Sequence, residues 1–184
     1  ITTPTNVFRE FVGYIAEKGY GICSMHDYLS KSKEERKKWI VCTFDDGYKS
    51  LTNDALEILK KQGFTATVFV CTGLIGKDNS WNNKDAILRE HLDINAINLL
   101  IKEGWEVASH GVFHKNLLKL SDVEIEYELL ESKKALNQIV GYCDTYAYPY
   151  GAYNKFIRHC VEKYYKYAFT VDQGGTSMVV DKHQ

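Results

Sequence analysis

The sequence predicts an α/β fold built on parallel strands. Apolar, β-branched segments alternate repeatedly with amphipathic segments along the chain, which is the pattern of strand–helix–strand units. The strongest strand candidate, residues 65–71 (TATVFVC), is apolar almost throughout, as strands buried on both faces are. No internal repeat or Pro/Gly/Ser-rich linker divides the 184 residues, so a single domain over residues 1–184 is the simplest organisation.

Each expected helix has an amphipathic pattern with a recognisable start or end. The expected helices cover residues 8–18, 53–62, 93–103, 121–140 and 154–163. Gly19 and Gly63 directly follow two of them, at the position where glycine commonly ends a helix. Asn53 is expected to cap the second helix, and Ser121 with Glu124 forms a capping box at the start of the fourth.

The expected strands are short and apolar. They cover residues 39–44, 65–71, 105–108, 145–148 and 167–171. Between the first helix and the first strand, Asp27 is expected to be the N-cap of a short helix. Because the chemistry of parallel α/β folds gathers at the carboxyl ends of the strands, the residues that follow each strand are the first candidates for a functional site.

Composition limits the class of function. Hydrophobic residues make up 45% of the chain and charged residues 26%, as in ordinary soluble globular proteins. A formal net charge of -1 argues against a nucleic-acid partner, and no apolar run reaches the roughly 18–20 residues that span a bilayer. The five cysteines form no CxxC pair, so neither a zinc–cysteine cluster nor a complete disulfide framework is expected.

Polar residues of unusual type stand at the expected strand ends. Asp45 and Asp46 of TFDDG follow the first strand, and His110 and His114 of SHGVFH follow the third. Two neutral imidazoles and a carboxylate are a common ligand set for a divalent metal in hydrolases. Such an ion would offset the cost of two adjacent carboxylates beside a buried strand. One carboxylate can then bind the metal while its neighbour takes a proton from the metal-bound water.

Each of these motifs taken alone has an ordinary structural explanation. Paired aspartates often serve as turn or cap residues, and single histidines are most often plain surface or core residues. Gly111 after His110 favours a loop or a single turn for the histidine pair over a regular helix. Only the combination of both motifs at successive strand ends favours a metal-dependent hydrolase.

The motifs TFDDG, SHGVFH and AYPYG, in this order and at these separations, resemble the polysaccharide deacetylases of carbohydrate esterase family 4, the group with NodB homology. The resemblance runs from about Trp39 to Val171. It implies a distorted (β/α) barrel with fewer than eight parallel strands, and it leaves open whether the last strand or strands lie within this sequence. It also implies hydrolysis of N-acetyl groups of N-acetylglucosamine residues in a polysaccharide, with release of acetate.

The resemblance also implies residue roles. Asp45 would be the catalytic base that activates a metal-bound water, and Asp46, His110 and His114 would bind a divalent metal, most often Zn2+. Further residues are candidates for contact with the substrate, although aromatic residues more often serve packing. These candidates are Tyr48, Trp81, Tyr150 and Gly151.

The sequence departs from the family pattern in its last motifs. Many members carry an arginine two residues before the proline of the third motif, where this chain has Ala147. The form AYPYG is similar to the branch that deacetylates poly-N-acetylglucosamine. Asp172 lies near a fourth motif whose aspartate tunes the catalytic acid, but a turn aspartate is the alternative. The Leu-x-His motif of the general acid is not evident, and His183 is interpreted as a loop histidine.

Several functions stay open on the sequence. A deacetylase of peptidoglycan, chitin oligomers or a precursor sugar is one alternative, a non-catalytic sugar-binding relative is another, and an amidase on small amides is a third. The expected partner is an N-acetylated polysaccharide or oligosaccharide. Most relatives are exported or anchored, so an extracytoplasmic location is favoured, while the cysteines leave a cytoplasmic one open. Because the chain starts at Ile1, a fragment or processed product is expected.

Overall fold

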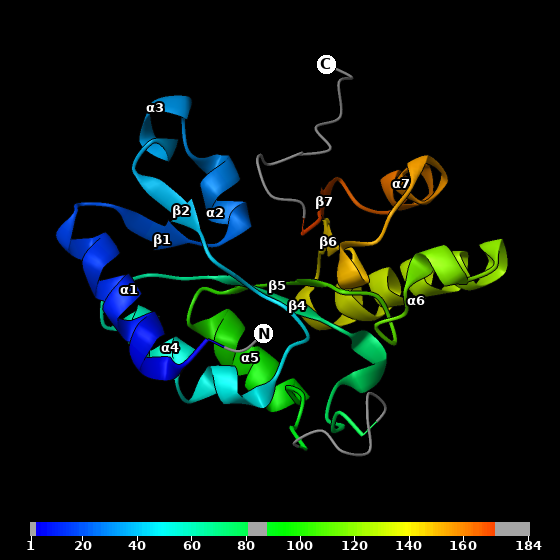
Figure 1. Ribbon diagram of the computed structural model, residues 1–184, viewed down its shortest axis with the longest axis horizontal. Helices are drawn as coiled ribbons and strands as arrows, with labels where there is room; N and C mark the ends of the chain where they lie inside the picture. The colour runs from blue at the N-terminus through cyan, green and yellow to red at the C-terminus, as the bar shows by residue number, and fades with distance from the viewer. Residues whose placement is uncertain (1–2, 81–87, 172–184) are drawn as a thin grey trace.

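A parallel five-stranded sheet forms the centre of the computed structural model, which describes residues 3–80 and 88–171 (Figure 1). The strand order β3-β4-β5-β6-β7 follows the order of the chain. The strands are β3 (Thr43–Phe44), β4 (Thr67–Val70), β5 (Glu106–Ser109), β6 (Thr145–Ala147) and β7 (Tyr167–Phe169). The sheet curls into a half-barrel, which confirms the expected distorted (β/α) barrel.

The last four helices of the described chain connect successive strands of this sheet, as parallel pairing requires, and the first three helices precede β3. The helices are α1 (Thr5–Glu17), α2 (Met25–Ser30), α3 (Lys33–Arg36), α4 (Ala55–Lys60), α5 (Ile94–Lys102), α6 (Asp122–Val140) and α7 (Lys155–Glu162). Short 3-10 turns are η1 (Lys49–Thr52), η2 (Thr72–Leu74), η3 (Leu117–Lys119) and η4 (Pro149–Gly151). Figure 1 shows α1, α4 and α5 gathered near one end of the sheet, with α6 and α7 near the other.

The first expected strand is divided between two sheets. Residues Trp39–Val41 form β2, which pairs in parallel with β1 (Gly21–Cys23), a strand that the sequence did not predict. The following residues form β3 and pair with β4. Cys42 lies between them, where its N–H donates to the Cys23 carbonyl at 3.3 Å and its own carbonyl accepts a bond from β4. The prediction of one strand over residues 39–44 was therefore wrong, because the partner changes within it.

The helix starts agree only in part with the sequence. The capping box is confirmed, since the Glu124 carboxylate accepts the Ser121 N–H at 2.8 Å. The prediction for Asp27 was wrong, because the Ser24 hydroxyl caps α2 and accepts the Asp27 N–H at 3.1 Å. The prediction for Asn53 was also wrong, because this residue closes the η1 turn and α4 starts after it.

The core lies between the curled sheet and its helices. Its fully buried side chains include Ile22, Leu59, Val68, Ile97, Leu100, Leu129, Leu136 and Tyr146. Truncating a leucine or isoleucine of this kind to alanine typically costs about 2–5 kcal/mol. This packing holds the strands, and therefore the loops at their carboxyl ends, in fixed positions. Within the described residues, no helix is both long and apolar enough to cross a membrane.

Candidate functional site

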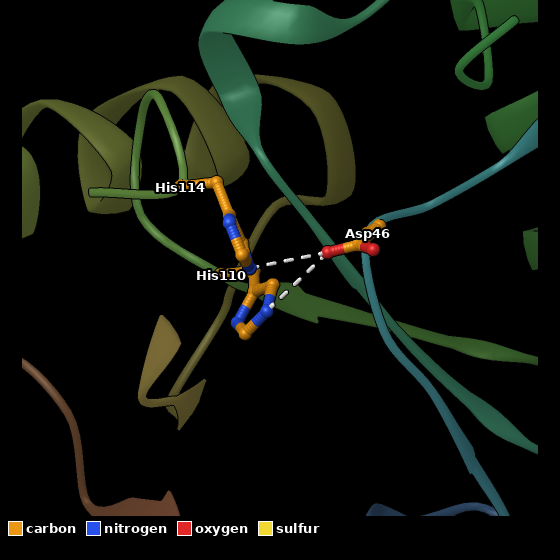
Figure 2. Close-up of side chains that lie close together, drawn as sticks. All are labelled: Asp46, His110 and His114. Carbon is orange, nitrogen blue, oxygen red and sulfur yellow. Dashed lines mark ion pairs between the residues drawn. The ribbon is translucent and has the colours of Figure 1, made fainter. Parts of the chain in front are cut away.

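Three predicted residues meet at the carboxyl ends of β3 and β5. The Asp46 Oδ1 atom lies 3.6 Å from His110 Nε2 and 3.3 Å from His114 Nε2. One ligand atom from each residue lies within 4.8 Å of the other two. Figure 2 shows the Asp46 side chain pointing from one backbone segment toward His110 and His114, which lie on another. We call Asp46, His110 and His114 the Asp-His-His group.

The separations within this group fit a shared metal ion. Two ligand atoms of a tetrahedral zinc site with bonds of about 2.0–2.2 Å lie roughly 3.3–3.6 Å apart. The two measured Asp46–histidine distances fall in this range. An aspartate oxygen and two imidazole nitrogens are also ligands that zinc accepts readily.

The hydrogen bond of one imidazole and the lowered pKa of the other suit a ligand role. The His110 side chain is 3% exposed, and its Nδ1–H donates to the Ala147 carbonyl at 2.9 Å. A carbonyl only accepts, so Nδ1 carries a proton in this bond, and the neutral tautomer that makes it has its lone pair on Nε2, the atom that faces Asp46. The pKa of His114 is lowered to about 4, chiefly by burial and next by the neighbouring His110, with Asp46 opposing the shift. The His114 imidazole is therefore neutral at physiological pH.

The backbone at the site has an unusual conformation. In the described residues, positive φ outside glycine occurs at Asp46 (67°), His114 (53°) and Tyr150 (61°). A left-handed conformation costs roughly 1–2 kcal/mol at a residue with a side chain, so the surroundings must hold it in place. Two of these residues belong to the Asp-His-His group, and the Tyr150 ring centroid lies 4.6 Å from that of His114.

A buried histidine outside the sequence motifs holds the Asp46 backbone. His91 is 3% exposed, and its Nδ1–H donates to the Asp46 carbonyl at 2.8 Å. Its ring stacks on Tyr48 with centroids 4.8 Å apart. The contact reaches a backbone atom from a segment distant in sequence, so no local pattern marks His91 as part of the site.

Gly47 makes the turn after Asp46 possible, and its replacement by alanine should destabilise the fold. Its φ is +67°, and a Cβ atom would lie 2.8 Å from Val70 Cγ1. Gly63 has the same φ of +67° but open space around its Cβ position, so it is a matched control for backbone strain. We expect Gly63→Ala to lower the free energy of unfolding by about 1–2 kcal/mol. The clash should add about 1–3 kcal/mol in Gly47→Ala.

Chemical denaturation of the two variants measures this difference. Equal losses in free energy of unfolding would show that the Val70 contact relaxes without cost, contrary to this expectation.

Asp45 lies beside the Asp-His-His group on the wall of a cavity. The cavity has a volume of about 630 Å³, and its wall includes Phe8, Phe44, Asp45, Asp46, Tyr48, Asp54 and Arg89. Desolvation of its carboxyl group raises the pKa of Asp45, His110 lowers it, and the Asp46 carboxylate raises it. A carboxylate with a raised pKa, beside a potential metal site and open to a cavity, is suited to accept a proton.

The third motif places one aromatic ring at the rim of the site. Tyr150 is 56% exposed and borders His114. The neighbouring Gly151 N–H donates to the Tyr148 carbonyl at 2.8 Å, so this group already has a partner within the chain. A substrate contact of Gly151 through that N–H would have to replace this bond.

The other predicted residues are placed as follows. The Tyr48 ring contacts His91 and also Arg89, whose guanidinium carbon is 5.7 Å from the ring centroid, and Tyr48 lines the cavity. Trp81, Asp172 and His183 lie outside the described residues.

Ala147 stands where many family members carry an arginine, and its methyl group is buried. Ala147 is 5% exposed and packs in an apolar cluster with Phe69, Ala108 and Phe169. Its backbone, rather than its side chain, serves the site, because its carbonyl holds His110.

Comparison with known proteins identifies similar sequences and folds. A model of the family described as polysaccharide deacetylase matches residues 32–168. The chain is 32% identical over 158 residues to the poly-beta-1,6-N-acetyl-D-glucosamine N-deacetylase of Staphylococcus aureus, covering 79% of this chain and 52% of that protein. It is 34% identical over 125 residues to the peptidoglycan-N-acetylglucosamine deacetylase PgdA of Listeria monocytogenes, covering 67% of this chain and 24% of that protein.

A solved structure supports the same grouping. The deacetylase PplD of Streptococcus pyogenes, in complex with acetate, superimposes with a TM-score of 0.78 at 25% identity, covering 95% of this chain and 80% of that chain. The chain spans between 24% and 61% of the length of the curated relatives it matches.

Proposed function

The chain belongs to the polysaccharide deacetylase family, and on that premise we propose that it is a metal-dependent hydrolase that removes N-acetyl groups from N-acetylglucosamine residues of a polysaccharide. The observation that carries the proposal is the Asp-His-His group with Asp45 beside it on the wall of a cavity. A metal site and an adjacent base are what amide hydrolysis requires.

In this proposal Asp46, His110 and His114 hold a divalent metal, with zinc the best match to their donor atoms. When bound, such an ion polarises the amide carbonyl and makes a water more acidic. Asp45 takes the proton of the attacking water, and its raised pKa makes it a stronger base than an ordinary aspartate. The buried bond from His110 to Ala147 keeps that imidazole fixed while the charge in the site changes.

The rim of the site supplies candidates for sugar contact. The exposed Tyr150 ring beside His114 offers an apolar face on which a pyranose can pack. Tyr48 lines the cavity next to Asp45, and Gly151 and Trp81 complete the set of proposed substrate residues.

We place poly-β-1,6-N-acetylglucosamine first among the polymers. The named deacetylase of this polymer matches a larger share of the chain than the named peptidoglycan enzyme does, 79% against 67%. Both polymers are found outside the cytoplasm, so we propose an extracytoplasmic site of action.

Acetate release from a panel of substrates tests the proposed function. The zinc-loaded chain and the chelator-treated chain are each incubated with poly-β-1,6-N-acetylglucosamine, peptidoglycan, chitin oligomers and a small acyclic amide. We expect zinc-dependent acetate release from the first polymer. Release from peptidoglycan or chitin alone would change the substrate, and hydrolysis of the small amide alone would make the protein an amidase. Binding of oligosaccharides without acetate release would identify a non-catalytic sugar-binding relative.

A further inference from the structure

The loop that carries both histidines is held from behind by a buried glutamate. Glu128 lies on α6 and is 4% exposed. Its Oε2 atom accepts the Val112 N–H at 2.6 Å and the Phe113 N–H at 3.1 Å. Both amides belong to the short segment between His110 and His114. A single carboxylate oxygen therefore orients two consecutive peptide groups between two residues of the Asp-His-His group.

Nothing else in the described chain explains why a carboxylate is buried there. The ion pairs between described residues do not include Glu128. A buried carboxylate without a cation is costly unless hydrogen bonds satisfy it. The two loop amides supply these bonds, so the glutamate and the loop stabilise each other.

The fit between the carboxylate and the loop is close. Gly111 has φ +81°, and a Cβ atom at this position would lie 2.9 Å from Glu128 Oε2. The loop therefore approaches the carboxylate at a position where a side chain would displace it. One residue beyond the second bonded amide, His114 adopts its left-handed conformation, with φ 53°.

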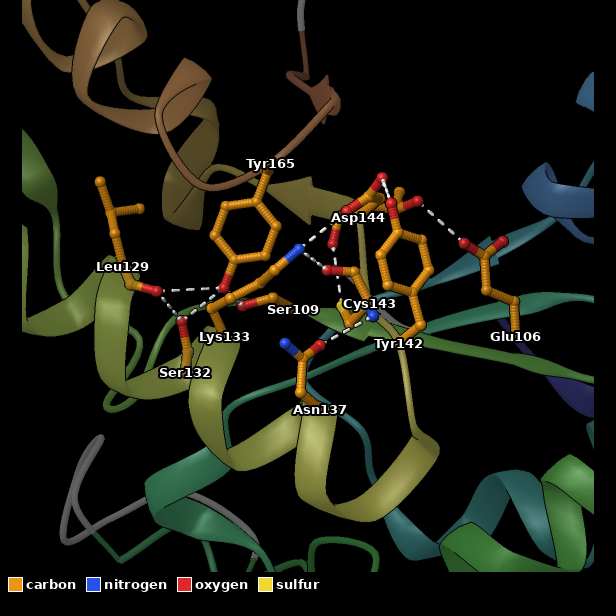
Figure 3. A network of polar contacts seen from close by, with 11 residues as sticks. Glu106, Ser109, Leu129, Ser132, Lys133, Asn137, Tyr142, Cys143, Asp144 and Tyr165 are labelled. Atoms are coloured by element: carbon orange, nitrogen blue, oxygen red, sulfur yellow. Dashed lines mark hydrogen bonds and ion pairs between the residues drawn. The ribbon is translucent and has the colours of Figure 1, made fainter.

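A second set of bonds ties the start of the same loop to the same helix. The Gly111 N–H donates to Ser109 Oγ at 3.2 Å, and the Tyr165 hydroxyl donates to that oxygen at 3.0 Å. The Tyr165 hydroxyl also lies 2.8 Å from the Ser132 hydroxyl, which donates to the Glu128 carbonyl at 2.6 Å. Figure 3 shows Ser109, Ser132 and Tyr165 converging next to α6.

We propose that Glu128 is a positioning residue of the metal site: through the Val112 and Phe113 amides, its carboxylate sets the separation and direction of the His110 and His114 imidazoles. This inference rests on the proposed function, because it concerns the same metal ligands. The proposed role requires a side chain long enough to bring an acceptor oxygen to both amides. It does not require a negative charge, because the amides are neutral. Outer residues that orient metal ligands typically change metal affinity by about 10–100-fold when they are replaced.

Two substitutions distinguish the effect of the length of the Glu128 side chain from the effect of its charge. Glu128→Asp keeps the negative charge but is one methylene too short to hold both amides. Glu128→Gln keeps the reach and an acceptor oxygen but loses the charge. We expect zinc affinity, measured by competition with a chelating dye, to fall about 10–100-fold in Glu128→Asp and less than about tenfold in Glu128→Gln. The visible spectrum of the cobalt-loaded protein should change in the aspartate variant and stay as in the wild type in the glutamine variant.

A control on the same helix excludes general loss of stability. Leu136 is fully buried on α6, away from the loop amides, so Leu136→Ala should lower stability and leave the cobalt spectrum unchanged. Circular dichroism establishes that each variant is folded.

The outcomes are distinct. Failure of the wild type to bind either metal would overturn the proposed function, whatever residue 128 does. If the wild type binds zinc and the folded aspartate variant binds it equally well with an unchanged cobalt spectrum, the positioning role is wrong. Equal losses in both Glu128 variants would also overturn it, because removing the charge at unchanged reach would then matter as much as shortening the side chain. Loss of metal in Leu136→Ala would overturn it as well, because general destabilisation would then account for the losses. If the aspartate variant does not fold, the glutamine variant decides, because the proposal requires it to keep the wild-type cobalt spectrum.

Discussion

Replacement of Asp45 by asparagine is expected to abolish acetate release while zinc stays bound. Asparagine has the same shape but cannot accept the proton of the attacking water at neutral pH. A general base contributes typically about 10²–10⁴-fold, so kcat should fall by at least about 100-fold. The Asp-His-His group does not include Asp45, so metal content should stay near that of the wild type. Acetate release and elemental analysis of the same preparation measure both quantities.

A second aspartate of the same cavity provides the control. Asp54 also lines the cavity, and its carboxylate accepts the Thr5 hydroxyl at 3.1 Å, but it lies outside the Asp-His-His group. Asp54→Asn should therefore keep most of the acetate release. Undiminished turnover in Asp45→Asn would assign the base to another residue, and an equal loss in both variants would point to the cavity as a whole.

Replacement of His110 by alanine is expected to remove the bound zinc. The Asp-His-His group would lose one of its three ligands and the bond that ties the site to the Ala147 carbonyl. We expect zinc affinity to fall by more than the roughly 10–100-fold that an outer residue typically contributes. Elemental analysis after zinc loading and desalting should give about one ion per chain for the wild type and almost none for the variant.

Replacing an exposed histidine tests whether the loss of any imidazole lowers the zinc content. The His159 side chain is 73% exposed on α7, so His159→Ala should retain zinc at the wild-type level. Retention of one zinc by a folded His110→Ala protein would mean that the ion binds elsewhere and would remove the main support for the proposed function.

The fold was predictable where one pattern extends over a whole element. Residues 65–71 are apolar apart from two threonines, and β4 lies within them with every residue buried. The division of residues 39–44 was not predictable, because it depends on which strand pairs with each half rather than on the residues themselves. β1 spans three residues, too few for any periodicity to show.

The candidate metal ligands were predictable from the sequence, but the residues that hold them in place were not. Asp46, His110 and His114 stood out because carboxylates and imidazoles are unusual at the ends of buried strands, and the structure brings these three together. Their supporting residues gave no such signal. His91 acts through a backbone carbonyl, and Glu128 is one of several glutamates in the α6 sequence, where only burial separates it from the others.

The strand order has a consequence for the way this molecule unfolds. β4 lies between β3 and β5, so Asp46 can meet His110 only when all three strands are docked in register. An unfolded or half-docked chain presents these ligands far apart, and an ion that uses all three therefore binds the native state selectively. By mass action, a free ion concentration of roughly 1,000 times its dissociation constant would stabilise the native state by about 4 kcal/mol. The ion would then hold β3, β4 and β5 together in the native state. The melting temperature of the protein would rise and fall with the concentration of free metal around it.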